Sequence, residues 1–215
     1  MKNATKKWNA VRKVIRRGHG SVVGRFQSTK ALEPIPYEST GERDFLYRLE
    51  VDPDVIEIYA QPTILRWKDA DVVRTHVPDF LIVRASGEEF IEVKPLKDVT
   101  LPLFQRRAKY LDAQERANGR SYTMVSEDWI RAEPAFGNAK ILLNGRGQEP
   151  TNEMRCRVLA CLTKKPRSFA DLVKTLNQKP YFVNALYALI VAGDLELTDP
   201  SQQIAWHSQV QKKGA

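Results

Sequence analysis

The stretch from His76 to Pro95 constrains the fold of this chain most. It reads HVPDFLIVRASGEEFIEVKP, and its apolar runs at 78–84 and 90–95 predict two strands joined by a turn around Gly87. Asp79 heads the first strand, and Glu92 and Lys94 lie near the end of the second. Either these charged residues are solvated strand ends, or the carboxylates are held together to bind a cation.

Strand geometry favours a shared site. Side chains alternate between the two faces of a strand, so Glu92 and Lys94 point the same way, and the hairpin can bring Asp79 beside them. Two close carboxylates repel each other unless a proton or cation lies between them. Mg²⁺ prefers oxygen ligands and keeps waters for a substrate phosphate. The carbonyl of Val93 is a further candidate ligand, and Glu42, on a preceding helix, could reach the same place.

Lys94 indicates which reaction this site could catalyse. A cation beside a metal can stabilise charge on a scissile phosphate or lower the pKa of the attacking water. The predicted reaction is therefore hydrolysis of a phosphodiester by an activated water.

The elements around the hairpin follow a defined order. STGERDFLYRLEVDPDV predicts a helix that begins at Ser39 or Thr40 and stops at the Asp-Pro-Asp. Strand-like runs follow, interrupted at Gln61-Pro62, and the hairpin is followed by a helix ending at Gly119 and by a further strand. This order is that of the PD-(D/E)XK restriction-endonuclease-like α/β core.

A second, smaller domain is predicted after a Gly-, Asn- and Pro-rich boundary near residue 148. Its apolar spacing indicates three short helices, the second capped by Ser168 and the third begun by Pro180, and a strand follows. This pattern is typical of a winged helix-turn-helix. The predicted organisation is a basic arm over residues 1–30, a nuclease domain over 31–148 and a winged-helix-like domain over 149–215.

Charge points to a polyanionic partner. The net charge is +8, and residues 1–30 hold nine Lys and Arg and no acid, which suits nucleic acid. The chain lacks an apolar run long enough for a membrane span, so no membrane partner is expected. Cys156 and Cys161, without a paired C-x-x-C motif, are read as small core residues of a cytosolic protein.

Five spaced strings carry a closer resemblance: an acidic helix, DPDV, a Gln-Pro, PDF and EVKP. Together they resemble the TnsA endonuclease subunit of heteromeric DNA transposases, over about residues 20–130. The resemblance implies that Glu42 is the acid on the helix, Asp79 the metal-binding Asp and Lys94 the catalytic Lys. Glu92 falls where the family varies between Glu and Gln, and Gln61 lies in the Gln-Pro string as a supporting residue.

The resemblance also implies an activity and partners. Expected are Mg²⁺-dependent cleavage of double-stranded DNA at the 5′ sides of transposon ends, with Mn²⁺ able to substitute, and a bacterial cytoplasmic location. A DDE-type transposase would cut the 3′ sides, and an ATPase regulator would be a further partner. Two alternatives stay open: a restriction- or repair-type nuclease that cuts alone, and a catalytically retired adaptor that binds DNA or protein.

Further basic and aromatic residues are candidates for contacts with DNA. Arg106 and Lys109 lie on the helix after the active strand, where a solvated helix face is an equal alternative. Lys179 and Tyr181 lie where a recognition helix would start, although winged helices also dock proteins. His76 lies near Asp79 and is expected to be packed or solvated rather than functional.

Overall fold

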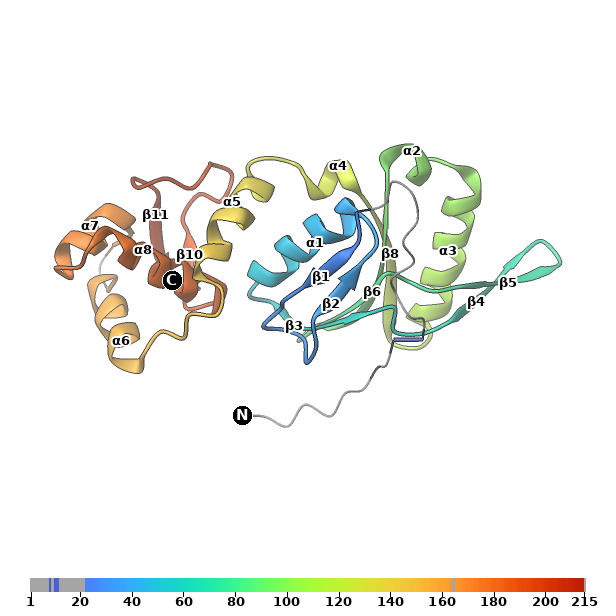
Figure 1. Cartoon of the computed structure of the whole chain (residues 1–215), viewed down its shortest axis with the longest axis horizontal. Coiled ribbons are helices and arrows are strands. Elements are labelled where there is room, and N and C mark those ends of the chain that lie inside the picture. The colour runs from blue at the N-terminus through green and yellow to red at the C-terminus, as the bar shows by residue number, and fades with distance from the viewer. Residues whose placement is uncertain (1–7, 9, 12–21, 164, 215) are drawn as a thin grey trace. The chain divides into compact units, whose positions relative to one another are not determined.

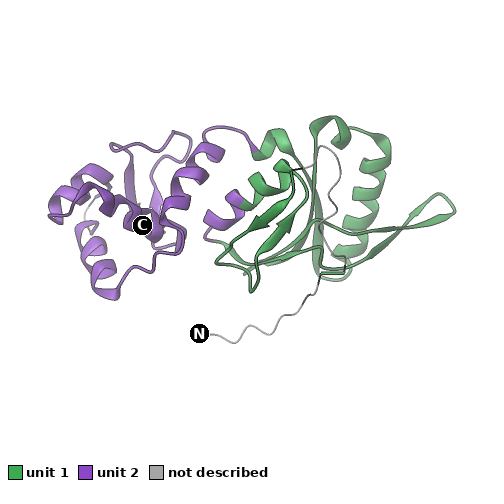
Figure 2. Cartoon of the chain, viewed as in Figure 1, with its two compact units in different colours: residues 1–46, 54–130 green, residues 47–53, 131–215 purple. Residues whose placement is uncertain are grey.

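The computed structural model describes residues 8, 10–11, 22–163 and 165–214 (Figure 1). The chain divides into two compact units, residues 1–46 with 54–130 and residues 47–53 with 131–215 (Figure 2). Most of the predicted basic arm, residues 1–7, 9 and 12–21, lies outside the described residues. Its remainder includes strand β1 (Gly24–Phe26), which pairs with β2 (Ile35–Tyr37).

A four-stranded sheet forms the centre of the first unit. Its strands lie in the order β3 (Val55–Ala60), β6 (Phe80–Arg84), β7 (Gly87–Lys94) and β8 (Arg120–Ser126). Strands β3, β6 and β7 pair antiparallel, and β7 pairs parallel with β8. The β6–β7 hairpin is the one predicted from the sequence, although β7 begins at Gly87 and the turn is correspondingly short.

Helices cover both faces of this sheet. On one face, Phe45 of α1 (Thr40–Val51) contacts Phe80 of β6. On the other, Leu111 of α3 (Pro102–Arg116) belongs to a buried cluster with Leu81 and Phe90. Neighbouring residues on a strand point to opposite faces, so Phe80 and Leu81 serve the two layers. Short helices α2 (Leu96–Val99) and α4 (Glu127–Ile130) follow β7 and β8. This mixed α/β arrangement is consistent with the expected nuclease-like core.

A second hairpin, β4 (Leu65–Asp69) with β5 (Val72–His76), forms a two-stranded sheet of its own. Figure 1 shows it projecting beyond α3 and the four-stranded sheet. The predicted strand-like runs on either side of Gln61-Pro62 correspond to β3 and β4. The break between them is local, because Gln61 adopts a positive φ of 46°.

The second unit contains the helices predicted near the C-terminus. They are α6 (Asn152–Cys161), α7 (Phe169–Thr175) and α8 (Val183–Val191), and α5 (Ala135–Leu142) packs with α8. The 3₁₀ turn η1 (Leu143–Gly145) follows α5. Because α5 supplies Ala139 and Leu142 to the apolar core of this unit, the unit starts upstream of the boundary predicted near residue 148.

A small sheet completes this unit, with β10 (Leu195–Leu197), β11 (Gln209–Lys212) and β9 (Arg167–Ser168) in that order. The predicted cap is present, since Ser168 Oγ accepts from the Asp171 N–H at 3.1 Å. Pro180 starts the 3₁₀ turn η2 (Pro180–Phe182) instead of α8. Both cysteines were predicted to be core residues. Cys161 packs against the core, but the prediction for Cys156 is wrong, because it is exposed. Among the described helices, none is both long and apolar enough to cross a bilayer.

Candidate active site

The backbone around Asp79 explains why the residue lies at this sheet edge. Pairing between β6 and β7 ends at Phe80 and Ile91, whereas β7 continues along β8 to Lys94. The Val93 N–H therefore faces the place that β6 has left, and it donates to Asp79 Oδ2 at 2.8 Å. This is the hydrogen bond that the Asp79 side chain makes among the described residues, and it fixes the carboxylate beside the end of β7.

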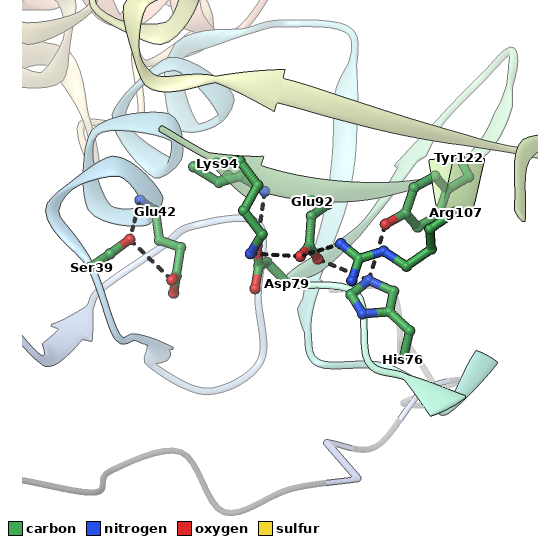
Figure 3. Close-up of polar contacts among 9 residues, drawn as sticks. Ser39, Glu42, His76, Asp79, Glu92, Lys94, Arg107 and Tyr122 are labelled. Carbon is green, nitrogen blue, oxygen red and sulfur yellow. Dashed lines mark hydrogen bonds and ion pairs between the residues drawn. The ribbon is translucent and has the colours of Figure 1, made fainter. Parts of the chain in front are cut away.

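Glu92 is the most heavily contacted residue of the site (Figure 3). It is 2% exposed, and its Oε1 lies 2.7 Å from Lys94 Nζ and 3.2 Å from Arg107 Nη2. His76 Nε2 lies 3.0 Å from Oε2. That contact has the distance of an ion pair without the direction of a good hydrogen bond, so within the described residues Oε2 has no well-aligned donor.

The surrounding cations keep Glu92 ionised. Burial works to raise the pKa of Glu92, but the contact with His76 and the charge of Lys94 outweigh burial and hold the pKa below its usual value. Burial would lower the pKa of Lys94, yet Glu92 and Asp79 outweigh it and raise that pKa. Lys94 is consequently protonated at neutral pH, so it can stabilise negative charge and cannot serve as a base.

Asp79 has the opposite character. Burial raises the pKa of Asp79 well above its usual value, and the charges of Glu92 and Glu42 raise it further. Lys94 and the Val93 N–H work against this rise without cancelling it. The sequence predicted that carboxylates would be crowded here, and the raised pKa of Asp79 agrees with that prediction. A nearby cation would stabilise the ionised form of Asp79.

Glu42 is near these groups but is held by its own helix. Ser39 caps the start of α1 and is bonded in turn by Glu42: the Glu42 N–H donates to Ser39 Oγ at 3.1 Å, while Ser39 Oγ donates to Glu42 Oε1 at 3.0 Å. The Glu38 N–H donates to Glu42 Oε2 at 2.8 Å. Burial raises the pKa of Glu42 despite these bonds. Figure 3 shows its carboxylate beside Ser39 and apart from the contacts around Glu92.

The donor set fits a hard divalent cation in part. Among the described residues, no three His, Cys, Asp or Glu side chains converge closely enough to hold a metal by themselves. Asp79 and Glu92 nevertheless offer two carboxylates, one with an oxygen that lacks an aligned donor. Mg²⁺ typically binds through one or two carboxylates and keeps several waters. Asp79, Glu92 and the Val93 carbonyl could hold it, and Glu42 could join by leaving Ser39.

The remaining predicted residues fall in different places. Gln61 is buried, and its N–H donates to the Asp79 carbonyl at 2.9 Å, so its backbone supports the site. Arg106 contacts Asp69 Oδ1 at 3.4 Å and is largely exposed, as is Lys109. Lys179 and Tyr181 are exposed in the second unit. The structure therefore brings together Asp79, Glu92 and Lys94.

Three residues that contact the site were not predicted as functional from the sequence: Arg107, His76 and Tyr122. Arg107 was overlooked beside Arg106, and His76 was expected to be packed or solvated. The third, Tyr122, lies with its hydroxyl 3.0 Å from His76 Nε2, and burial raises its pKa. The helical period holds a weak signal for Arg107: it lies four residues before the buried Leu111 and so on the inner face of α3. No comparable signal marks His76 or Tyr122, whose meeting depends on the tertiary fold.

A mixed α/β core with acidic residues and a lysine at one sheet edge is consistent with a nuclease. Comparison with known families supports the same class: residues 52–134 match the family model described as TnsA-like endonuclease N terminal. The chain is thus similar to TnsA over this region, which confirms the resemblance noted in the sequence and supports a nuclease role related to transposition. The match includes Asp79, Glu92 and Lys94; it begins after Glu42 and ends before most of the second unit. A search of curated proteins found no match.

Proposed function

We propose that this protein is a Mg²⁺-dependent DNA endonuclease subunit of a heteromeric transposase, and that it hydrolyses phosphodiesters at the 5′ sides of transposon ends. The observation that carries the proposal is the meeting of Asp79, Glu92 and Lys94 at one sheet edge inside the TnsA-like region. Such a set suits hydrolysis, because carboxylates can hold a cation while an ammonium faces the developing charge.

Each side chain has a distinct part in this chemistry. When bound, the divalent ion would supply a Lewis acid at the scissile phosphate. Asp79 and Glu92 provide carboxylate oxygens at a fixed spacing, because the Val93 N–H holds one of them and Lys94 and Arg107 hold the other. Lys94 remains an ammonium and stabilises negative charge that develops on the phosphate. Glu42 would complete the acidic set from α1 by leaving its bond with Ser39.

The second unit is proposed to serve recognition rather than cleavage. Its helices α6, α7 and α8 with the small sheet support a winged-helix-like arrangement. Lys179 and Tyr181 are exposed just before α8 and could meet DNA or a protein. A DDE-type transposase and an ATPase regulator are the proposed protein partners, and they would contribute much of the choice of DNA site.

The decisive test is cleavage of a plasmid that carries transposon ends, with the purified chain alone and with a DDE-type transposase. We expect 5′-side cuts that need Mg²⁺ or Mn²⁺, need the transposase, and disappear in Asp79→Asn and in Lys94→Ala. Mapping of the cut strands separates the 5′ from the 3′ side. Efficient cutting by the chain alone would favour a restriction- or repair-type nuclease. A protein that neither cuts nor binds Mn²⁺, with and without DNA, would instead be a retired adaptor.

A further inference from the structure

Among the described strands, β4 and β5 pair only with each other, and their hairpin projects from the nuclease unit (Figure 1). Its register pairs Leu65 with His76 and Asp69 with Val72 across a two-residue turn. Directly opposed residues in such a pair share a face, so the hairpin has two distinct sides. One side carries Leu65, Trp67 and Asp69, and the other carries Arg66 and Lys68.

The base of the hairpin is fixed beside the candidate active site. Leu65 and Trp67 are buried in the cluster that includes Leu111 of α3 and Tyr122 of β8. His76, the last residue of β5, reaches within 3.0 Å of Glu92 Oε2. The projecting part therefore starts at the catalytic carboxylates and has a rigid attachment.

The charges on the hairpin are arranged for an anionic partner. Asp69 is neutralised twice, by Arg74 at 3.2 Å and by Arg106 of α3 at 3.4 Å. Arg66 and Lys68 are exposed on the opposite side and form no ion pair among the described residues. The other acid of the hairpin, Asp71, is exposed in the two-residue turn at its tip. One face thus presents two free cations with the apolar Val73 and the hydroxyl of Thr75.

We propose that the β4–β5 hairpin binds the DNA backbone next to the cleaved bond, with Arg66 and Lys68 contacting phosphates. The inference rests on the proposed function, because it takes the cleaved DNA as the partner. A strand of five residues spans about 17 Å, which corresponds to about five nucleotides along one strand. The contacts should therefore lie within about five nucleotides of the cut, on one side of it.

The test compares three full-length proteins: wild type, the double variant Arg66→Ala/Lys68→Ala, and the charge-preserving control Arg66→Lys/Lys68→Arg. Binding to a DNA duplex containing a transposon end is measured by fluorescence anisotropy over a range of salt concentrations. Each phosphate contact contributes about 0.9 to the slope of log K against log salt. We expect the alanine variant to lose about 1.8 from the magnitude of the slope, and the control to keep the wild-type slope. Hydroxyl-radical footprints should lose protection within about five nucleotides of the cut.

The outcomes separate this inference from the proposed function. If the alanine variant keeps the wild-type slope and footprint while wild type binds and cuts, the hairpin does not contact phosphates and the nuclease assignment stands. If the slope falls as expected but no protein cuts with metal and transposase present, the hairpin binds DNA and the assignment as an endonuclease is wrong. Absence of DNA binding by wild type, both alone and with the transposase present, overturns both. Melting curves that match among the three proteins exclude a folding defect, which is not expected because both side chains are exposed.

Discussion

At the scale of single residues, the site sets two neighbouring carboxylates in opposite electrostatic environments. Glu92 lies among Lys94, Arg107 and His76, and its contacts with His76 and Lys94 lower its pKa, while burial and nearby acids raise the pKa of Asp79. In the metal-free protein, Asp79 is therefore the group that resists ionisation. A cation bound between the two would reverse this resistance, and so metal affinity should rise with pH.

The same asymmetry predicts a pH-dependent effect on stability. Because the pKa of Asp79 is raised in the folded state, the stability linked to its protonated form is complete below the ordinary range of an Asp and is lost as the pH rises through the raised pKa. Asp79→Asn removes this loss. We expect the variant, in EDTA, to gain thermal stability relative to wild type at pH 8 and to gain less at pH 4.5.

The control for this experiment is Asp71→Asn, which makes the same chemical change in the exposed turn of the β4–β5 hairpin, away from the site. A variant at Asp79 that loses stability at pH 8 would show that its ionised carboxylate stabilises the fold.

Arg107 is expected to orient Glu92 rather than to react itself. Its Nη2 lies 3.2 Å from Glu92 Oε1, and it is largely buried. Removing a group that orients a metal ligand typically lowers metal affinity or activity about tenfold to a hundredfold. We expect Arg107→Met to reduce DNA cleavage at saturating DNA by that factor. A shifted Mn²⁺ titration would show that the effect passes through the metal site.

Gln105→Met is the matched control for this variant, because Gln105 is exposed two residues away on the same helix. Unchanged cleavage and Mn²⁺ binding in Arg107→Met would mean that Lys94 and His76 hold Glu92 without help.

At the scale of elements, the start of α1 connects helix stability with the position of Glu42. The reciprocal bonds between Ser39 and Glu42 satisfy donors at the helix end that would otherwise lack partners. Loss of such a cap costs about 1 kcal/mol. Ser39→Ala should lower the free energy of unfolding by that amount in urea, and Ser39→Thr, which keeps a hydroxyl, should restore most of it.

This cap also tests whether Glu42 is free to join the metal. If Ser39→Ala tightens Mn²⁺ binding while stability falls, Glu42 joins the metal once its partner is gone, and unchanged affinity would mean that Glu42 takes no part in binding. Weaker Mn²⁺ binding would instead mean that the cap itself places Glu42 for the metal.

The elements that could be predicted from the sequence are those with local signals. The start of α1, with Ser39 or Thr40 as candidate caps, the β6–β7 hairpin and helix α3 followed from capping residues, alternation and a terminal glycine. The small sheet of the second unit could not be predicted in full, because β9 has two residues and β11 is mostly polar. In the site, Asp79, Glu92 and Lys94 follow from strand parity. Contacts made by His76 and Tyr122 join residues 46 apart in sequence, and no local pattern encodes them.

At the scale of the whole molecule, the two compact units should respond separately to mutation. Gly145 closes η1 in the second unit, where an added Cβ would lie 2.4 Å from the Ala188 nitrogen and 2.7 Å from the Tyr187 carbonyl carbon. The backbone of α8 would have to move to accommodate it. We expect Gly145→Ala to destabilise this unit by about 1–3 kcal/mol, and calorimetry should show a transition shifted to lower temperature.

Mn²⁺ binding by the folded Gly145→Ala protein should remain that of wild type, since the proposed metal ligands belong to the first unit. Gly147→Asn is the control, because Gly147 has a positive φ of 73° that Asn tolerates and open space around it. A variant that loses metal binding while the first unit remains folded would show that the two units are coupled.

The bond between Asp79 and the Val93 N–H has a practical consequence for trapping complexes. Asp79 takes the place of a missing strand partner at the end of β7, so alanine at this position would leave a main-chain donor unpaired beside Lys94. An inactive protein made in that way would lack the carboxylate and would also have a disordered end of β7 where the substrate is proposed to bind. Asparagine keeps an acceptor for the same donor, and it is the better choice for capturing the proposed DNA substrate uncut.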